Sequence, residues 1–232
     1  MPEPATVIWL RREHAGTGRP AERSRSELTG AALAIADSEG LPAVSMRRVA
    51  GHLGTGPASL YRYVTNRDDL LDLMADAVAA EYQLREPGDD WMADLIEVAS
   101  QARSIMLRHP WLPELVIAGA TIGPRAADLL EYVLTVLKDH PASAATKLTA
   151  FAVMTAVTAA FAQNEISAGA SAPQRQAAYL QHVASAGAHP HLAEALSALR
   201  RQTGDPADQF TMVIGKVLAG LLPIAAPCTP AG

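Results

Sequence analysis

The chain has 232 residues, of which 49% are hydrophobic and 19% charged, so one large or two small domains with a sizeable core are expected. Its single cysteine, Cys228, excludes a disulfide framework within one chain, which fits the reducing cytoplasm. The N-terminus lacks the apolar segment of a secretory signal. The longest uncharged run, residues 148–164, is short and polar for a membrane span, which needs about 20 mostly apolar residues. We expect a buried helix there and no membrane partner.

The charge of the chain is unevenly distributed. The formal net charge of −5 argues against nucleic-acid binding by the chain as a whole. Residues 1–67, however, contain nine arginines and six acidic residues, a balance of +3, whereas residues 68–232 contain ten basic and eighteen acidic residues, a balance of −8. DNA affinity requires a local basic face rather than a basic chain. A nucleic-acid interface is therefore compatible with the first third of the sequence.

The N-terminal third predicts short helices after an extension. Residues 1–23 are expected to be partly disordered, or docked as an extra helix through Trp9. The apolar stripe of Leu28, Ala32 and Ile35 predicts a first helix over residues 24–38. Further helices are expected over residues 46–53 and 57–63, and from Thr65 or Asn66 to about Leu84, which completes a domain spanning 24–84.

Residues 45–67 carry the most informative pattern, S-M-R-R-V-A-G-H-L-G-T-G-P-A-S-L-Y-R-Y-V-T-N-R. Ser45 is expected to cap one short helix, and Gly54 to turn the chain sharply with a positive φ. Leu60 and Val64, four residues apart, then point back to the core. This is the organisation of a helix-turn-helix, whose second helix enters the major groove of DNA.

The outward side chains of this segment have the chemistry of a DNA interface. Arginine binds guanine edges or phosphate, and tyrosine donates to phosphate or lies against a thymine methyl. The alternative is a solvated helical hairpin whose tyrosines only pack. The arginines of the N-terminal extension could also lie along the minor groove, which is the less favoured interpretation of that segment. The candidate DNA-binding residues are Ser45, Arg47, Arg48, Thr55, Ser59, Tyr61, Arg62, Tyr63 and Arg67.

Residues 25–84 resemble the DNA-binding domain of the tetracycline repressor (TetR) family of bacterial transcription regulators. The resemblance rests on A-A-L-A-I-A-D-S-E-G-L at 31–41, S-M-R-R-V-A at 45–50, L-G-T-G-P-A-S-L-Y-R-Y-V at 53–64 and N-R-D-D-L-L-D-L-M at 66–74. The M-R-R-V-A and L-L-D-L-M pieces resemble the branch whose C-terminal half is akin to that of the tetracycline repressor itself. Pro57 departs from the pattern, because relatives often carry a polar base-reading residue at this position.

The segment E-P-G-D-D at residues 86–90 is the clearest internal break, so a second domain is predicted over 90–223, with a disordered tail over 224–232. Its apolar spacing indicates helices, expected over residues 91–108, 111–118, 124–139, 142–168, 173–186, 192–201 and 206–222. The predicted fold is therefore all-α, with an N-terminal three-helix helix-turn-helix domain joined by a long helix to a C-terminal helical domain. The resemblance implies that this second domain is the ligand-binding and dimerisation domain.

The resemblance implies a ligand pocket in the second domain, which is rich in alanine and glycine. Small residues let helices approach or leave a cavity, and a few polar groups orient a ligand there. The candidate wall residues, each of which could equally be plain core packing, are Trp111, Phe151, Met154, Thr155, Thr158 and His182. A dimer interface is expected from the 142–168 and 206–222 helices, through Ala152, Ala156, Ala159, Ala160, Val213, Val217, Leu218 and Leu221.

Enzyme signatures are missing from the sequence, which has no phosphate-binding loop, no G-x-S-x-G and no H-E-x-x-H. His189-x-His191 lacks further ligands at metal-binding spacing, so no metal or cofactor is expected. We therefore expect a ligand-responsive repressor that binds a palindromic operator in double-stranded DNA as a homodimer and is released by a small, largely apolar effector. The alternatives are a helical-bundle enzyme with a helix-turn-helix-like hairpin and a DNA-binding regulator without a ligand.

Overall fold

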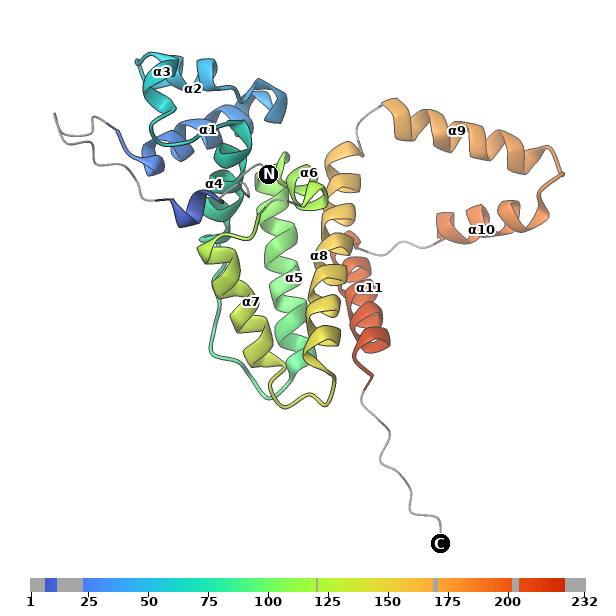
Figure 1. The fold of residues 1–232 in the computed structure, drawn as a ribbon. Helices are drawn as coiled ribbons and strands as arrows, with labels where there is room; N and C mark the ends of the chain where they lie inside the picture. Colours follow the sequence, from blue (N-terminus) through green and yellow to red (C-terminus); the bar gives the residue numbers. More distant parts are fainter. Residues whose placement is uncertain (1–6, 12–22, 120, 169–170, 202–204, 224–232) are drawn as a thin grey trace, which may run out of the picture.

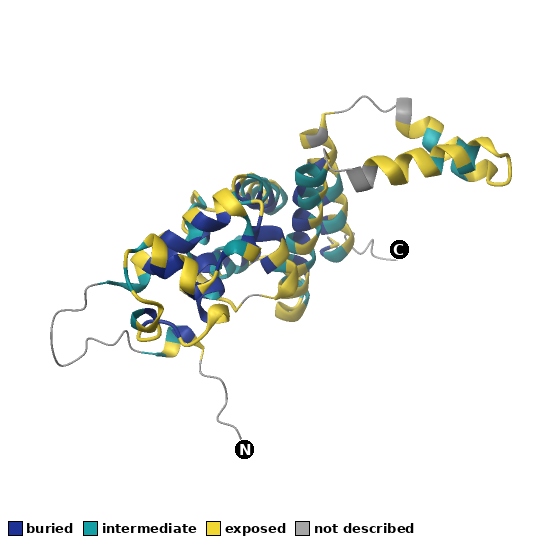
Figure 2. Cartoon of the chain, turned by 90° about the horizontal axis from the view of Figure 1, so that it is seen from above, coloured by how far each residue is buried: buried dark blue, intermediate teal, exposed yellow. Residues whose placement is uncertain are grey.

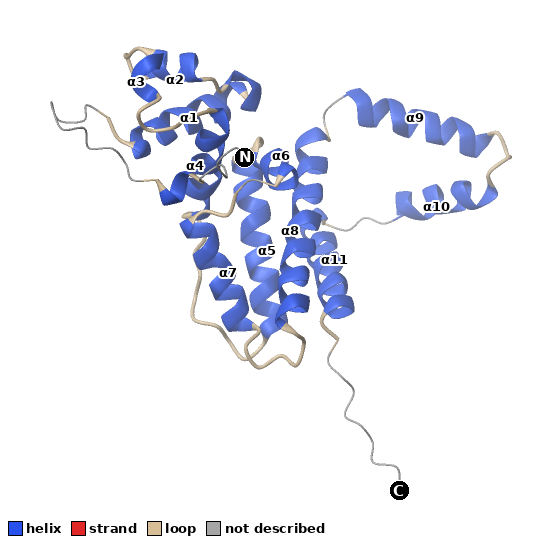
Figure 3. Ribbon diagram, viewed as in Figure 1, coloured by secondary structure: helices blue, strands red, loops and turns tan. Residues whose placement is uncertain are grey.

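The computed structural model describes residues 7–11, 23–119, 121–168, 171–201 and 205–223. Over these residues the regular structure is entirely helical, with loops between the helices (Figure 3), so the all-α prediction is confirmed. An N-terminal head lies at one end of a helical body, and an arm of two helices projects from the body on the side away from the head (Figure 1).

The head, body and arm are each built from consecutive helices, except that the last helix returns to the body. The head comprises the 3-10 helix η1 (Ile8–Leu10), α1 (Arg25–Glu39), the 3-10 helix η2 (Leu41–Ala43), α2 (Met46–His52), α3 (Pro57–Leu60) and α4 (Arg67–Ala79). The body comprises α5 (Trp91–Arg108), α6 (Leu112–Ala118), α7 (Pro124–Val136), α8 (Ala144–Ser167) and α11 (Pro206–Leu221). The arm comprises α9 (Ser171–Ser185) and α10 (Pro190–Arg201).

Polar side chains mark the starts of most of these helices. At α1 a capping box forms: Ser24 Oγ accepts from the N–H of Glu27 (3.1 Å), and the Glu27 carboxylate accepts from the N–H of Ser24 (2.8 Å). A side-chain oxygen that accepts from the first turn also starts α2, α4, α5, α8 and α11, supplied by Ser45, Asn66, Asp90, Ser143 and Asp205.

Two hydrophobic clusters hold the molecule together. The first joins the apolar faces of α1–α4 to the end of α5, to α6 and to two alanines of α8. The second fills the body between α5, α7, α8 and α11, and fully buries Met154, Phe210 and Ile214. The body helices α5, α8 and α11 pack side by side (Figure 1). The head therefore shares its core with the near end of the body.

The helix α8 is long and apolar enough to cross a membrane by length and composition, a test that core helices also pass. It packs against α5, α6 and α11. Only 22% of its most apolar window is buried within the single chain, so the predicted burial holds for one face alone. The other face exposes Leu148, Ala152, Ala156 and Ala160, which repeat every four residues.

The arm stands apart from both clusters. α9 and α10 pack against each other, and most of their described side chains are exposed (Figure 2). Tyr179 and Leu199 are among the exposed large apolar residues. The helices predicted over residues 173–186 and 192–201 are thus present, but they cover no part of the body in the single chain.

Several predicted features of the head differ from the structure. α3 ends at Leu60 and continues as turns over residues 61–63, and α4 ends at Ala79 rather than near Leu84. In the extension, Ile8 is the fully buried residue and docks η1 against the head, while Trp9 is half-buried. Residues 1–6, 12–22 and 224–232, for which disorder was predicted in part, lie outside the described residues.

Candidate DNA-binding surface and effector cavity

The predicted helix-turn-helix forms over α2, the following turn and α3. Gly54 adopts a φ of +66°, the left-handed conformation that favours glycine. The N–H of Thr55 donates to the carbonyl of Ala50 (2.9 Å), which closes the turn, and Leu60 is fully buried beneath α3. Pro57 occupies the first turn of α3, where an N–H is not needed.

Three predicted DNA-binding side chains lie on the outside of this unit. Tyr61 is 54% exposed, and Arg47 and Arg62 are also exposed. Neither arginine has a hydrogen-bond or ion-pair partner among the described residues. Two guanidinium groups and a phenol at a helix-turn-helix are suited to phosphate and base-edge contacts.

Four further candidates are engaged within the head. Ser45 Oγ accepts from the N–H of Arg48 (3.2 Å), and the Arg48 guanidinium forms an ion pair with Glu39 at the end of α1. The hydroxyls of Thr55 and Ser59 lie 2.9 Å apart, and the Ser59 hydroxyl is 2.7 Å from the Gly56 carbonyl. These contacts brace the helix-turn-helix and leave each group at or near its surface.

The outward placement predicted for Tyr63 is wrong, whereas Arg67 is exposed as predicted but is also engaged within the head. Tyr63 is only 4% exposed, because the turns after Leu60 carry its ring into the head core. Arg67 starts α4, and its guanidinium donates back to the carbonyls of Val44 (2.9 Å) and Leu41 (3.0 Å). Arg67 therefore ties α4 to η2, and its role as a phosphate contact stays a prediction.

Other arginines of the head serve the same internal purpose, which sequence reasoning missed. Arg23 donates to the carbonyl of Leu53 at the end of α2 (2.8 Å), and Arg25 donates to the carbonyl of Tyr63 (3.1 Å). Their acceptors are main-chain atoms, which carry no residue-type signal in a sequence. Much of the positive charge counted over residues 1–67 is thus used to hold the head together.

Arg11 links the N-terminal extension to α4 through Asp69. Its guanidinium forms an ion pair with the Asp69 carboxylate, which also accepts from the N–H of Thr65 (2.6 Å). Partial burial alone would raise the pKa of Asp69, but these contacts outweigh it and hold the pKa below its ordinary value. The extension is therefore fastened by charge as well as by the burial of Ile8.

An apolar cavity of about 190 Å³ lies between the head and the body. Its walls come from α4, from α5, α6, α7 and α8, and from the segment between α6 and α7. The residues that line it are Ala75, Asp76, Val78, Ala79, Tyr82, Ile105, Met106, Leu112, Val116, Thr121, Ile122, Ala126, Leu129, Leu130, Phe151 and Thr155. Since α4 follows the helix-turn-helix and shares its hydrophobic cluster, a molecule in this cavity would touch a helix that packs within the DNA-binding head.

Two aspartates of α4 fasten it to the segment that roofs the cavity. Asp76 is buried, and its Oδ1 accepts from the N–H groups of Arg125 (2.8 Å) and Ala126 (3.2 Å) at the start of α7. One turn earlier, Asp72 accepts from the N–H of Thr121 (2.9 Å). A Cβ atom at Gly123 would overlap the Asp76 side chain, so the close approach of the two segments requires glycine.

Of the six predicted wall residues, the structure brings two to the cavity, Phe151 and Thr155. Met154 and Thr158 belong to α8 but are buried elsewhere, and the Thr158 hydroxyl donates to the Met154 carbonyl (2.8 Å). Trp111 lies at the head–body junction, where Nε1 donates to Asp37 (2.6 Å). His182 is exposed on the arm and is not a wall residue in the single chain.

Tyr82 is a polar wall residue that is absent from the predicted set. It follows α4 and lines the cavity. Burial raises the pKa of its phenol well above the ordinary value, so the group remains a neutral donor. Within the described part of the chain, no cluster of three or more His, Cys, Asp or Glu side chains is arranged to hold a metal ion.

Comparison with known protein families covers both parts of the chain. Residues 28–74 match the bacterial regulatory proteins of the tetR family, and residues 85–224 match the tetracyclin repressor-like C-terminal domain. The chain belongs to the TetR family. The recognition made from residues 25–84 is thereby confirmed, and the fold of head and body is the one found in this family.

Several named members of the TetR family are similar to this chain. The HTH-type transcriptional repressor DrrR1 of Streptomyces coeruleorubidus is 38% identical over 136 residues, which cover 57% of this chain and 50% of DrrR1. ActR of Streptomyces coelicolor in complex with (S)-DNPA is 30% identical with a TM-score of 0.75, over 86% of this chain and 97% of ActR. ActR in complex with actinorhodin is 27% identical with a TM-score of 0.73, over 87% and 96%.

The sequence matches and the structural matches cover different shares of the related proteins. The matched segments span about half the length of the curated relatives, 50% of DrrR1 and 56% of a transcriptional regulator of Saccharopolyspora erythraea. The structural similarity to ActR extends over nearly the whole of ActR. ActR is a TetR-family protein crystallised with two different small molecules, and both complexes share the fold described here.

Proposed function

We propose that this protein is a cytoplasmic transcriptional repressor that binds a palindromic operator as a homodimer and releases it when a small, largely apolar effector enters the cavity. The observation that carries the proposal is the helix-turn-helix with Arg47, Tyr61 and Arg62 exposed on a TetR-family head. DrrR1 is named as a repressor, and other matched relatives are named as transcriptional regulators or repressors. We therefore propose regulation rather than catalysis.

The cavity supports the effector part of the proposal. Apolar side chains from five helices surround it, with the Tyr82 phenol and the Thr155 hydroxyl among the few polar groups. Its volume of about 190 Å³ is below the 300–1,000 Å³ typical of sites for drug-sized molecules. Such an effector would have to widen the cavity, and α4 is one of the walls that would move. Movement of α4 would displace the DNA-binding surface attached to it.

The uncovered faces of α8 and α11 support the dimer. Leu148, Ala152, Ala156 and Ala160 are exposed on α8, and Met212 is exposed on α11. Of the residues predicted for the interface, Ala159 and Leu218 are buried in the single chain and Val213, Val217 and Leu221 are half-buried. Two copies related by a two-fold axis would cover the exposed stripes and place two heads on successive major grooves, about 34–36 Å apart.

The operator proposal is tested by selecting bound duplexes from a random DNA pool and measuring affinity for the enriched sequence. Arg47→Ala combined with Tyr61→Ala should lower operator affinity at least tenfold, since a good base contact contributes about 1–3 kcal/mol. Arg175→Ala, which removes an exposed arginine of the arm, is the matched control and should leave affinity unchanged. Enrichment of a single half-site, or unchanged affinity in the double variant, would contradict the proposal.

The effector proposal is tested by titrating the protein–operator complex with actinorhodin and (S)-DNPA, the molecules bound by ActR. A compound that binds and releases DNA should lose both effects in Thr155→Trp, which fills the cavity. Glu131→Trp, at an exposed position of α7, should respond as the parent protein does. Release that persists in Thr155→Trp would place the effector elsewhere.

A further inference from the structure

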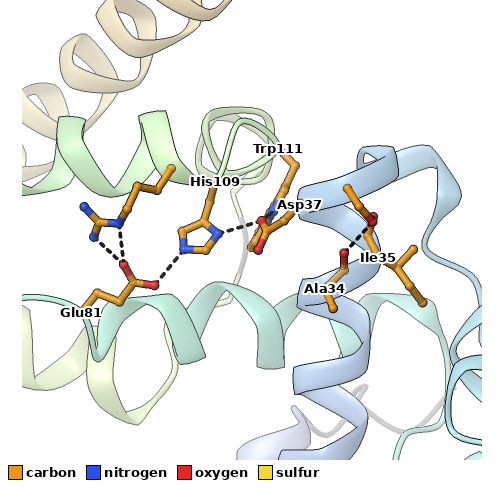
Figure 4. A network of polar contacts seen from close by, with 8 residues as sticks. Ala34, Ile35, Asp37, Glu81, His109 and Trp111 are labelled. Carbon is orange, nitrogen blue, oxygen red and sulfur yellow. Dashed lines mark hydrogen bonds and ion pairs between the residues drawn. The ribbon is translucent and has the colours of Figure 1, made fainter.

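A histidine of the body lies between two carboxylates of the head. His109 ends α5, and its Nδ1 is 2.8 Å from Asp37 Oδ1 on α1. Its Nε2 is 2.7 Å from Oε1 of Glu81, just beyond the end of α4 (Figure 4). The ring is well enclosed, with 13% of the side chain exposed. One imidazole thus connects the end of α5 to α1 and to the segment that follows α4.

Two neighbours complete this group of contacts. Trp111 Nε1 donates to the same oxygen of Asp37 (2.6 Å), and its ring lies 5.6 Å from the ring of His109. The Arg108 guanidinium binds the other oxygen of Glu81. Burial alone would raise the pKa of Glu81, but Arg108 and His109 outweigh it and hold the pKa below the ordinary value. Asp37, Glu81 and Arg108 are the charged groups that face the imidazole.

The geometry selects one protonation state of the imidazole. A neutral imidazole carries one N–H and can donate to one carboxylate, which leaves a ring lone pair facing the other carboxylate oxygen. The imidazolium carries two N–H groups and donates to both. With both ring nitrogens within 2.8 Å of ionised acceptors, the contacts are satisfied only when the ring is protonated. Loss of that proton removes one of the two contacts that His109 makes with the head.

We propose that protonated His109 is a latch that holds the head in its operator-binding position against the body, and that deprotonation loosens this position and weakens operator binding. This inference rests on the proposed function and adds a proton as a second input beside the effector. No exposed histidine of the arm, such as His182, joins the head to the body in this way.

The latch and the cavity share the same structural elements. Glu81 follows the cavity-lining Val78 and Ala79 on α4, and His109 follows the cavity-lining Ile105 and Met106 on α5. Under the proposed function an effector has to widen the cavity, so the arrangement with the narrow cavity is the one that binds DNA. An effector that pushes α4 away from α5 would therefore work against the contact between Glu81 and His109.

The first test measures affinity for the selected operator duplex at about pH 6 and pH 8.5, on either side of the range in which histidine ordinarily titrates. The parent protein should lose roughly fivefold more affinity at the higher pH than His109→Gln does, in line with typical coupling between sites. His182→Gln is the matched control on the arm, and His52→Gln controls for the exposed histidine at the end of α2. Both should keep the parental pH dependence. Equal pH dependence in His109→Gln and the parent would overturn the latch.

The second test needs no DNA and uses the unmodified protein. Nitrogen-15 NMR of histidine-labelled protein at about pH 6.5 should show two N–H signals for the His109 ring, assigned by their loss in His109→Gln. Asp37→Asn and Glu81→Gln should each lower the protonated fraction of this ring. A single ring N–H in the parent protein would overturn the latch, whatever its effect on DNA. Failure to enrich any operator would instead count against the proposed function, while the NMR result would still decide whether the imidazolium bridge exists.

Discussion

The candidate DNA-binding surface and the candidate effector cavity are built in opposite ways. The surface comes from one continuous segment, residues 45–67, in which capping by Ser45 and the left-handed Gly54 set the geometry locally. The cavity draws on side chains from residue 75 to residue 155 on five helices, and its shape depends on how those helices pack. Local turn chemistry can be predicted from residue types, whereas a packed cavity requires the tertiary arrangement.

The same contrast occurs within the surface itself, between side chains that face solvent and those that hold the head together. Arg47, Tyr61 and Arg62 are exposed without a partner among the described residues, whereas Tyr63 is buried and the exposed Arg67 donates to main-chain carbonyls of the head. The two groups lie close together within residues 45–67. Substitution of a residue that holds the head together should lower the free energy of unfolding. Substitution of a residue that faces solvent should lower operator affinity instead.

The largest effect is expected from the two tyrosines of the recognition segment. Tyr63→Ala should lower the free energy of unfolding by about 3–5 kcal/mol, because it leaves a cavity in the head core. Tyr61→Ala should change it by less than about 0.5 kcal/mol while lowering operator affinity. Urea unfolding followed by circular dichroism provides the first quantity. Similar destabilisation by the two substitutions would show that the inward and outward assignment is wrong.

The close contact between Gly123 and Asp76 at the roof of the cavity can be measured by substitution, with Gly51 of α2 as the control. Gly123→Ala should lower the free energy of unfolding by about 1–3 kcal/mol, because its methyl group overlaps Asp76 and displaces the cap of α7. Gly51→Ala is the matched control, since a methyl group in this helix meets open space and should stabilise by about 0.4–1 kcal/mol. The same unfolding experiment measures both, and a neutral Gly123→Ala would mean that the α4 contact is loose.

Arg67 and Arg62 are expected to differ in the same way as the two tyrosines. Arg67→Ala should lower the free energy of unfolding by about 1–2 kcal/mol, because the carbonyls of Leu41 and Val44 lose their donors. Arg62→Ala should leave stability within about 0.5 kcal/mol and lower operator affinity roughly tenfold or more. Operator affinity of Arg67→Ala, measured where it is fully folded, should change much less than that of Arg62→Ala. The reverse order would make Arg67 the stronger DNA contact.

The smallest effect concerns the pH dependence of the N-terminal docking. The pKa of Asp69 lies below its ordinary value, so its ionised form stabilises the fold above the unfolded pKa of about 3.9, and this stability is lost as pH falls through the lower folded value. Arg11→Gln should reduce stability by less than about 1 kcal/mol at neutral pH, since the pair is partly exposed. The difference from the parent protein should shrink below about pH 4 in urea titrations.

Sequence reasoning predicted the helices of the chain well and the direction of long side chains poorly. Capping residues and apolar stripes located α1, α2 and α5 to within a residue or two. The internal contacts of Arg67 were not predicted because its acceptors are carbonyls of residues 41 and 44, which become neighbours only when η2 folds beside α4. Tyr63 was misplaced because α3 ends three residues before the helical spacing predicts.

The cavity could be predicted only in part for a related reason. Phe151 and Thr155 lie on the face of α8 that meets α5 and α7, and their residue types suggested a wall. Asp76 interrupts an apolar helix, but its partners are backbone N–H groups almost fifty residues away. His182 looked equally suitable as a polar wall residue, yet α9 leaves the body altogether. Periodicity identifies a buried face without identifying what covers it.

The shared core of head and body bears on how such proteins can be recombined. Ile105, Leu112 and Leu115 of the body belong to the same apolar cluster as Leu28 and Met74 of the head. A chimera joined in the loop after residue 84 would therefore separate one half of this cluster from the other. Exchange of DNA specificity between relatives should succeed more often when the end of α5 and α6 are transferred together with the head. The segment that has to be transferred as one piece is therefore larger than the helix-turn-helix domain.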